Sequence, residues 1–127
     1  MKILLDTHVF LWYINADSRL PKLIRDAIRD PNNECFLSVV SLWEIIIKSG
    51  IGKLPLPEAP DIYVPREREA HAIASLPIDE ASVKRLARLP MHHRDPFDRM
   101  LVCQALEHDL HVATVDPQVR AYAVKLL

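Results

Sequence analysis

The stretch Lys2-Ile3-Leu4-Leu5-Asp6-Thr7 is an apolar run that stops at a carboxylate. Three successive aliphatic residues without polar alternation are typical of a strand that is covered on both faces, as in a parallel sheet between helices. Asp6 would then lie at the carboxyl end of this strand, where open α/β sheets collect their ligands. A helix cap or a turn is the alternative role for this aspartate. The run therefore predicts a buried first strand with a candidate functional acid at its end.

The composition indicates a single globular domain over residues 1–127. Half of the chain is hydrophobic and 26% is charged, with 16 basic and 17 acidic residues. No apolar run approaches the roughly 20 residues that a membrane span needs, and the N-terminus lacks the pattern of a signal peptide, so we expect a cytoplasmic protein without a membrane partner. The balanced charge gives no indication of nucleic-acid binding, although it permits a local basic rim around an acidic centre. Cys35 and Cys103 lie in apolar stretches, which favours small core residues over a disulfide.

The rest of the chain alternates helical and extended patterns, which predicts the α/β class with a parallel sheet. The predicted helices cover residues 7–15, 19–29, 39–49, 66–72, a segment after Asp79, 97–108 and 117–122. The further predicted strands cover residues 35–38, 72–78, 110–114 and 124–127. Residues 50–65 contain both glycines and several prolines, so we expect an irregular connection there.

Glu44 lies in the middle of a predicted helix, residues 39–49, that is apolar nearly all round. A buried carboxylate without a partner is costly, so Glu44 must face a cleft, pair with a base or bind a metal. The alternative is an exposed ion pair with Lys48, four residues further along the helix. The scarcity of polar residues around Glu44 favours the cleft.

The most informative polar stretch is His92-His93-Arg94-Asp95-Pro96-Phe97-Asp98-Arg99. Asp95 fits a helix N-cap, followed by a proline at the first helical position and by Asp98 at the third. This helix-start pattern accounts for the presence of an aspartate at position 95, but only in part for the one at position 98. Arg99 is placed to screen Asp98 or to hold a phosphate. The two histidines have no metal-ligand spacing, so a solvated loop is expected there rather than a zinc site.

Four acids follow predicted strands or begin the helices after them: Asp6, Glu44, Asp98 and Asp116. For Asp116 a cap role is also strong, because a proline follows it. In a right-handed βαβ sheet all these positions lie at the same edge, so the four carboxylates should converge. Carboxylates that gather without bases repel one another, and a bound Mg²⁺ or Mn²⁺ is the usual resolution. Such a cluster hydrolyses phosphodiesters with metal-activated water, which points to a nucleic-acid substrate.

Four segments in this order also carry a family resemblance. They are Leu-Leu-Asp-Thr-His at 4–8, Ser-Leu-Trp-Glu-Ile at 41–45, His-Arg-Asp-Pro-Phe-Asp-Arg at 93–99 with Gln-Ala at 104–105, and Ala-Thr-Val-Asp-Pro at 113–117. Nearly end to end, the chain resembles PIN-domain proteins, specifically VapC-like ribonuclease toxins of bacterial type II toxin–antitoxin pairs. The resemblance implies a three-layer α/β/α fold with a central parallel sheet of about five strands. It also implies Mg²⁺- or Mn²⁺-dependent endoribonuclease activity, often on tRNA or other structured RNA, a homodimer and a cognate antitoxin.

The resemblance assigns roles to individual residues. It places the catalytic and metal-binding acids of the family on Asp6, Glu44, Asp98 and Asp116. Asp98 takes the third place rather than Asp95, because the family's acid opens a helix whose small residue, seven positions on, matches Ala105. Thr7 and Thr114 resemble the hydroxyls that orient these acids, and Asp95 supports them as a cap. Arg94 and Arg99 are candidates for phosphate contacts.

The apolar excess of the predicted helices at residues 7–15 and 39–49 predicts a partner surface. Phe10, Trp12, Tyr13, Trp43 and the run 45–47 exceed what a small core needs, so we expect some of them to contact the antitoxin or a second copy.

Two other functions stay open. An Asp6-nucleophile phosphatase would need a second aspartate two residues on, where this chain has His8. A non-catalytic binding module would use the acids only as caps.

Overall fold

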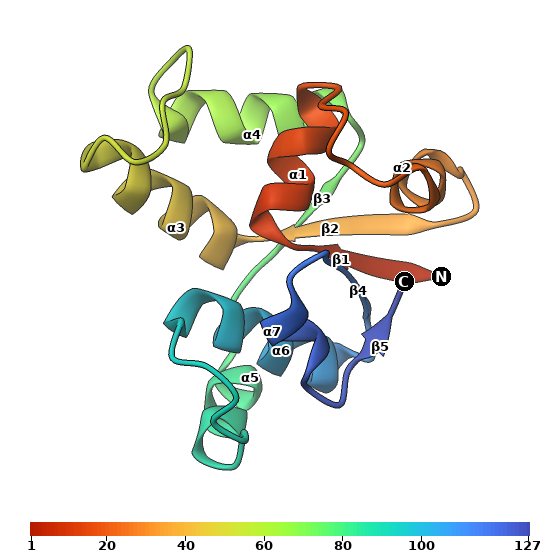
Figure 1. The fold of residues 1–127 in the computed structure, drawn as a ribbon, viewed down its shortest axis with the longest axis vertical. Helices are drawn as coiled ribbons and strands as arrows, with labels where there is room; N and C mark the ends of the chain where they lie inside the picture. Colours follow the sequence, from red (N-terminus) through yellow and green to blue (C-terminus); the bar gives the residue numbers. More distant parts are fainter.

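The computed structural model describes residues 1–127 and places a five-stranded parallel sheet between two layers of helices (Figure 1). The strands are β1 (Lys2–Leu5), β2 (Glu34–Ser38), β3 (Ala74–Leu76), β4 (His111–Ala113) and β5 (Lys125–Leu126), in the order β3-β2-β1-β4-β5. One face carries α1 (Thr7–Ile14), α2 (Lys22–Arg29), α3 (Val39–Gly50) and α4 (Pro60–Ala70). The other carries α5 (Glu80–Lys84), a 3₁₀ turn (Arg85–Ala87), α6 (Pro96–His108) and α7 (Pro117–Arg120). The predicted three-layer α/β/α fold is confirmed.

Strand β1 lies at the centre of the sheet and carries both halves of the core. Ile3, Leu4 and Leu5 are completely buried. Because successive side chains of a strand point to opposite faces, Ile3 and Leu5 pack with α1 to α4, whereas Leu4 packs with α6 and α7. The unbroken apolar run is therefore the expected pattern of a strand with a hydrophobic core on each side.

The predicted irregular connection at residues 50–65 is wrong in its second half. Helix α4 begins at Pro60, six residues before the predicted start, and contains Pro65. An internal proline costs a helix about 3 kcal/mol, which is why the sequence pattern predicted a break. Tyr63 and Val64 precede it and are 5% and 1% exposed in the core, so their burial outweighs that cost.

The parallel topology brings the carboxyl ends of β1, β2 and β4 to one edge of the sheet (Figure 1). The backbone N–H of Asp6, just past β1, donates to the carbonyl of Ala113 at the end of β4 over 3.0 Å. Helix α3 starts directly after β2, so its first turns lie at the same edge. This edge is where the sequence predicts the functional acids.

No helix has the length and apolar character that a membrane crossing requires.

Candidate active site

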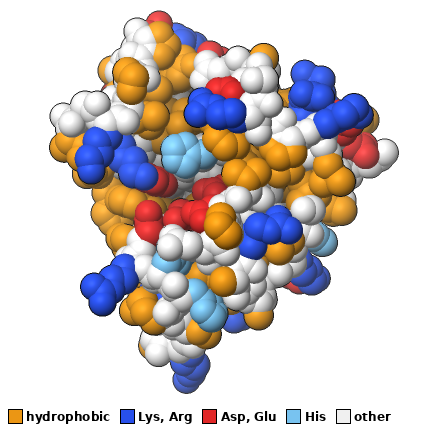
Figure 2. Space-filling view, in the orientation of Figure 1, with side chains coloured by type: hydrophobic (Ala, Val, Ile, Leu, Met, Phe, Trp, Pro, Cys, Tyr) orange, Lys and Arg blue, Asp and Glu red, His pale blue; other side chains and the backbone are white.

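An acidic pocket of about 390 Å³ lies at the carboxyl edge of the sheet. Five carboxylates line it, those of Asp6, Glu44, Asp95, Asp98 and Asp116. The other lining residues are His8, Trp12, Arg19, Lys48, Val115 and Pro117. Figure 2 shows acidic side chains gathered in the middle of this face, with basic and hydrophobic side chains around them. The structure thus brings together the four acids that the sequence predicts to converge, and adds Asp95.

Helix starts hold three of these acids in place. Asp6 is the N-cap of α1, and Asp95 is the N-cap of α6. Asp116 caps α7 and accepts the backbone N–H of Gln118 over 2.9 Å. Each of these three side chains therefore both caps a helix and lines the pocket. The caps also restrict how these carboxylates can turn.

Both carboxylate oxygens of Asp6 accept hydrogen bonds. Oδ1 accepts the backbone N–H of Thr7 over 2.7 Å, and Oδ2 accepts the hydroxyl of Thr114 over 2.6 Å. Burial raises the pKa of Asp6 above its ordinary value, although these two hydrogen bonds oppose the shift. The Thr114 oxygen also accepts the N–H of Asp116 over 3.0 Å, so one hydroxyl links two of the acids.

Glu44 is only 3% exposed and has a partner for each oxygen. The Thr7 hydroxyl donates to Oε1 over 2.8 Å, and the Lys48 ammonium pairs with Oε2. Because the single hydroxyl hydrogen of Thr7 goes to Glu44, the Ser41 hydroxyl donates to Thr7. The cleft and the Lys48 ion pair, which the sequence left as alternatives, are therefore both present, and the pair lies in the pocket rather than on an exposed face.

Lys48 carries the positive charge closest to the acids. Partial burial by itself lowers its pKa, but the hydrogen bond to Glu44 and the charges of Glu44, Asp95 and Asp98 raise the pKa above the ordinary value. The ammonium therefore stays charged inside an acidic pocket.

Asp98 responds both to burial and to the crowded charges. Burial, which is the larger cause, and the charges of Asp6, Asp95, Glu44 and Asp116 together raise its pKa to about 8. Without a bound cation, the Asp98 carboxyl therefore holds a proton at neutral pH. Part of this shift is the repulsion that a cluster of carboxylates should produce, and the larger part comes from burial.

No group of three or more His, Cys, Asp or Glu side chains is arranged to hold a metal ion as the side chains stand. The roles of the four acids as metal ligands and catalysts stay predictions.

The prediction that Arg99 contacts phosphate is wrong. Arg99 is only 7% exposed, and its guanidinium donates to the carbonyl of Pro90 over 2.8 Å and to the hydroxyl of Tyr122 over 3.0 Å. These buried partners hold the guanidinium away from solvent. Arg94 is exposed, and its phosphate contact stays a prediction.

The solvated loop predicted at the two histidines is half wrong. His92 is exposed, but His93 is buried against Tyr122 and Asp98. The sequence offered one signal for this, since His93 stands two residues before the cap of α6 and five before Asp98. Tyr122 is 29 residues away from His93, and no local pattern connects the two.

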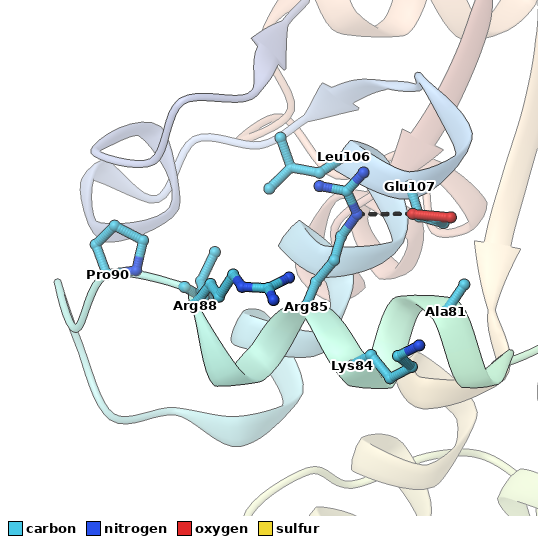
Figure 3. A pocket seen from close by; sticks show the side chains of 8 residues that line it. Ala81, Lys84, Arg85, Arg88, Pro90, Leu106 and Glu107 are labelled. Atoms are coloured by element: carbon cyan, nitrogen blue, oxygen red, sulfur yellow. Dashed lines mark hydrogen bonds and ion pairs between the residues drawn. The ribbon is translucent and has the colours of Figure 1, made fainter.

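A second pocket, of about 410 Å³, differs in chemistry from the acidic one (Figure 3). It lies between α5, the 3₁₀ turn and the end of α6, and Lys84, Arg85 and Arg88 line it. Its single acid, Glu107, is paired with Arg85 over 2.8 Å. Because Glu107 and Asp98 lie near opposite ends of α6, this pocket is separate from the acidic pocket.

Comparison with known proteins gives both sequence and structural matches. Ribonuclease VapC16 of Mycobacterium tuberculosis is 37% identical over 70 residues, which make up 50% of this chain and about half the length of that relative. VapBC2 from Rickettsia felis, in a crystal structure with a DNA fragment from its promoter, matches with a TM-score of 0.72 and 13% identity over 100% of this chain and 97% of the other. DNA-bound VapBC from Salmonella typhimurium matches with a TM-score of 0.69 and 18% identity over 99% and 96%.

At such identities the structural matches establish a shared fold. The family model described as PIN domain matches residues 3–125, nearly the whole chain. The chain belongs to the PIN domain family.

Proposed function

We propose that this chain is a Mg²⁺- or Mn²⁺-dependent endoribonuclease that acts as the toxin of a type II toxin–antitoxin pair. The observation that carries the proposal is the acidic pocket at the carboxyl edge of the sheet, in which crowding and burial raise the pKa of Asp98 to about 8. Membership of the PIN domain family and the partial match to a ribonuclease support the same class of reaction.

The donor set of the pocket fits a hard divalent cation. Carboxylate oxygens are the ligands that Mg²⁺ and Mn²⁺ prefer, and a cation offsets both the burial and the repulsion that raise the pKa of Asp98. Asp6, Glu44, Asp98 and Asp116 would hold the ion. When bound, such an ion polarises the phosphate and supplies a nucleophilic water at neutral pH.

The chain's own side chains supply positioning and phosphate binding. Thr114 and Thr7 hold the carboxylates of Asp6 and Glu44 by hydrogen bonds, which restricts how these two acids can turn in the pocket. Lys48 and Arg19 line the pocket and offer positive charge to an RNA backbone that enters it.

A cognate antitoxin and a second copy of the chain are the proposed protein partners. Structural matches to VapBC complexes support the antitoxin. An apolar face on α3, made of Trp43, Ile46 and Ile47, which are 56%, 40% and 46% exposed, supports a protein partner on this side. Phe10 and Ile45, which the sequence grouped with this surface, are instead completely buried in the core.

Cleavage of a structured RNA such as tRNA tests the proposal. We expect the wild-type chain to cleave with Mg²⁺ or Mn²⁺ and to stop when EDTA is added. Asp6→Asn and Asp98→Asn should fold and lose cleavage. Asp26→Asn is the matched control, because Asp26 is an exposed aspartate on α2 that pairs with Lys22 outside the pocket. Full activity in the Asp6 and Asp98 variants would refute the proposal.

A non-catalytic module is the second candidate, because Asp6, Asp95 and Asp116 all serve as helix caps. This function predicts no RNA cleavage and no heat when Mn²⁺ is titrated into the protein.

A further inference from the structure

We infer that His93 is a positioning residue that holds the Asp98 carboxylate in the acidic pocket, as the end of a buried chain of hydrogen bonds from Arg99 through Tyr122. The inference rests on the proposed function, in which Asp98 is one of the acids that would hold the metal ion.

The chain of hydrogen bonds is continuous and shielded from water. The Arg99 guanidinium lies 3.0 Å from the Tyr122 hydroxyl, which lies 2.9 Å from Nδ1 of His93. On the other side of the imidazole ring, Nε2 lies 3.3 Å from Oδ2 of Asp98. His93, Arg99 and Tyr122 are 8%, 7% and 4% exposed. Water therefore does not compete for the contacts that join Arg99, Tyr122 and His93, and only the Asp98 end of the chain meets the pocket.

The donors and acceptors fix the direction of the chain. Arginine only donates, so the Tyr122 oxygen accepts from Arg99. Its own hydrogen then goes to Nδ1 of His93, since otherwise this buried hydroxyl would have no acceptor. Nδ1 therefore carries no hydrogen, and Nε2 carries the one that faces Asp98. The imidazole is set to donate to the Asp98 carboxylate.

Asp98 has no other side chain to hold it. Thr114 donates to Asp6 and Thr7 donates to Glu44, whereas His93 is the only side chain hydrogen-bonded to the Asp98 carboxyl. The anchors behind His93 are firm, because Arg99 also bonds the carbonyl of Pro90 over 2.8 Å. His93 thus does for Asp98 what the two threonines do for Asp6 and Glu44.

Calorimetric titration of Mn²⁺, together with kcat and KM for RNA cleavage, tests the inference. We expect His93→Leu to weaken Mn²⁺ binding by about 10- to 100-fold. It should lower kcat and leave KM unchanged, because the buried ring does not reach RNA. His93→Gln should restore part of the affinity, since its amide still donates to Asp98.

The neighbouring histidine provides the matched control. His92 is exposed and stacks edge-on against Tyr122 at a centroid distance of 4.7 Å, without a hydrogen bond to Asp98. His92→Leu should bind Mn²⁺ and cleave RNA as the wild type does. Circular dichroism verifies that each variant folds. If His93→Leu does not fold, Tyr122→Phe decides, and it should weaken Mn²⁺ binding several-fold.

Asp98→Asn separates the two ways in which the test can fail. If Asp98→Asn loses Mn²⁺ binding but His93→Leu, or Tyr122→Phe in its place, binds as the wild type, the positioning role is overturned and the proposed function stands. If the wild type and Asp98→Asn bind Mn²⁺ alike, or neither binds it, the proposed function fails and the inference fails with it.

Discussion

Asp98 joins the chemistry of the pocket to the stability of the chain. Its pKa is about 8 in the folded protein and has an ordinary value of 3.8. Between these pH values the folded state holds a proton that the unfolded chain has released. The free energy of unfolding therefore falls as pH rises through this range. Burial of an acid among other acids is thus a stability cost that grows with pH.

A pH series of urea unfolding curves without metal tests this link. We expect the wild type to lose stability between about pH 4 and pH 8, the two limits set by Asp98. Asp98→Asn removes the titrating group, so its stability should decline less over the same range. Asp26→Asn, on the surface, should decline as the wild type does. Equal slopes for the wild type and Asp98→Asn would contradict the raised pKa.

The sequence predicts the carboxylates of the site better than the side chains that hold Asp98 in place. Asp6 and Asp116 follow β1 and β4, and the parallel sheet alone brings such positions to one edge. No such rule predicts the hydrogen bond between His93 and Tyr122, because this contact depends on how α7 and the loop before α6 pack. The prediction for Arg99 failed for the same reason. The sequence shows that Arg99 stands beside an acid, but it does not show the buried groups that bind the guanidinium.

Helix ends in this chain use residues with a Cβ where glycine is usual. With two glycines in all, the chain places Ala16, Ala72 and Asp109 at φ values of 51°, 57° and 56°. The left-handed region costs the two alanines roughly 1–2 kcal/mol each, whereas aspartate is one of the few residues other than glycine that adopt it. The sequence gives no stop signal at these ends, and helix boundaries are accordingly less predictable here than helix existence.

Ala72→Gly should relieve this strain after α4. Ala72 is exposed and left-handed. Glycine adopts this conformation freely but also gains freedom in the unfolded chain, so we expect a net gain of about 0.5–1 kcal/mol in the free energy of unfolding. Chemical denaturation measures the gain. Ala70→Gly, at an exposed helical position, should instead lower stability. A loss in the Ala72 variant would contradict the argument.

The two hydrophobic clusters depend on one strand. Ile3 and Leu5 belong to the larger cluster, and Leu4 belongs to the smaller one on the other face of the sheet. The sequence predicts that β1 is buried on both faces, because its apolar run, without polar alternation, is typical of a strand covered on both sides. Both clusters should therefore be lost together when β1 is weakened.

Leu4→Ala tests whether the protein unfolds as one unit. The truncation removes a completely buried side chain, so we expect the free energy of unfolding to fall by about 2–5 kcal/mol. In a Trp43→Phe background, Trp12 is the single tryptophan and packs against the opposite cluster. Its fluorescence and the circular dichroism should therefore show the same lowered midpoint. A Trp12 transition that stays at the parental midpoint would show that the two faces unfold separately.

The outer strands have a consequence for how the protein behaves in concentrated solution. β3 and β5, at the two margins of the sheet, are three and two residues long. Such short edge strands offer few unpaired backbone N–H and C=O groups to which a strand of another molecule could hydrogen-bond. The edges of the sheet therefore disfavour the strand-to-strand association that starts fibrils, even though the central strands are among the most apolar segments of the chain.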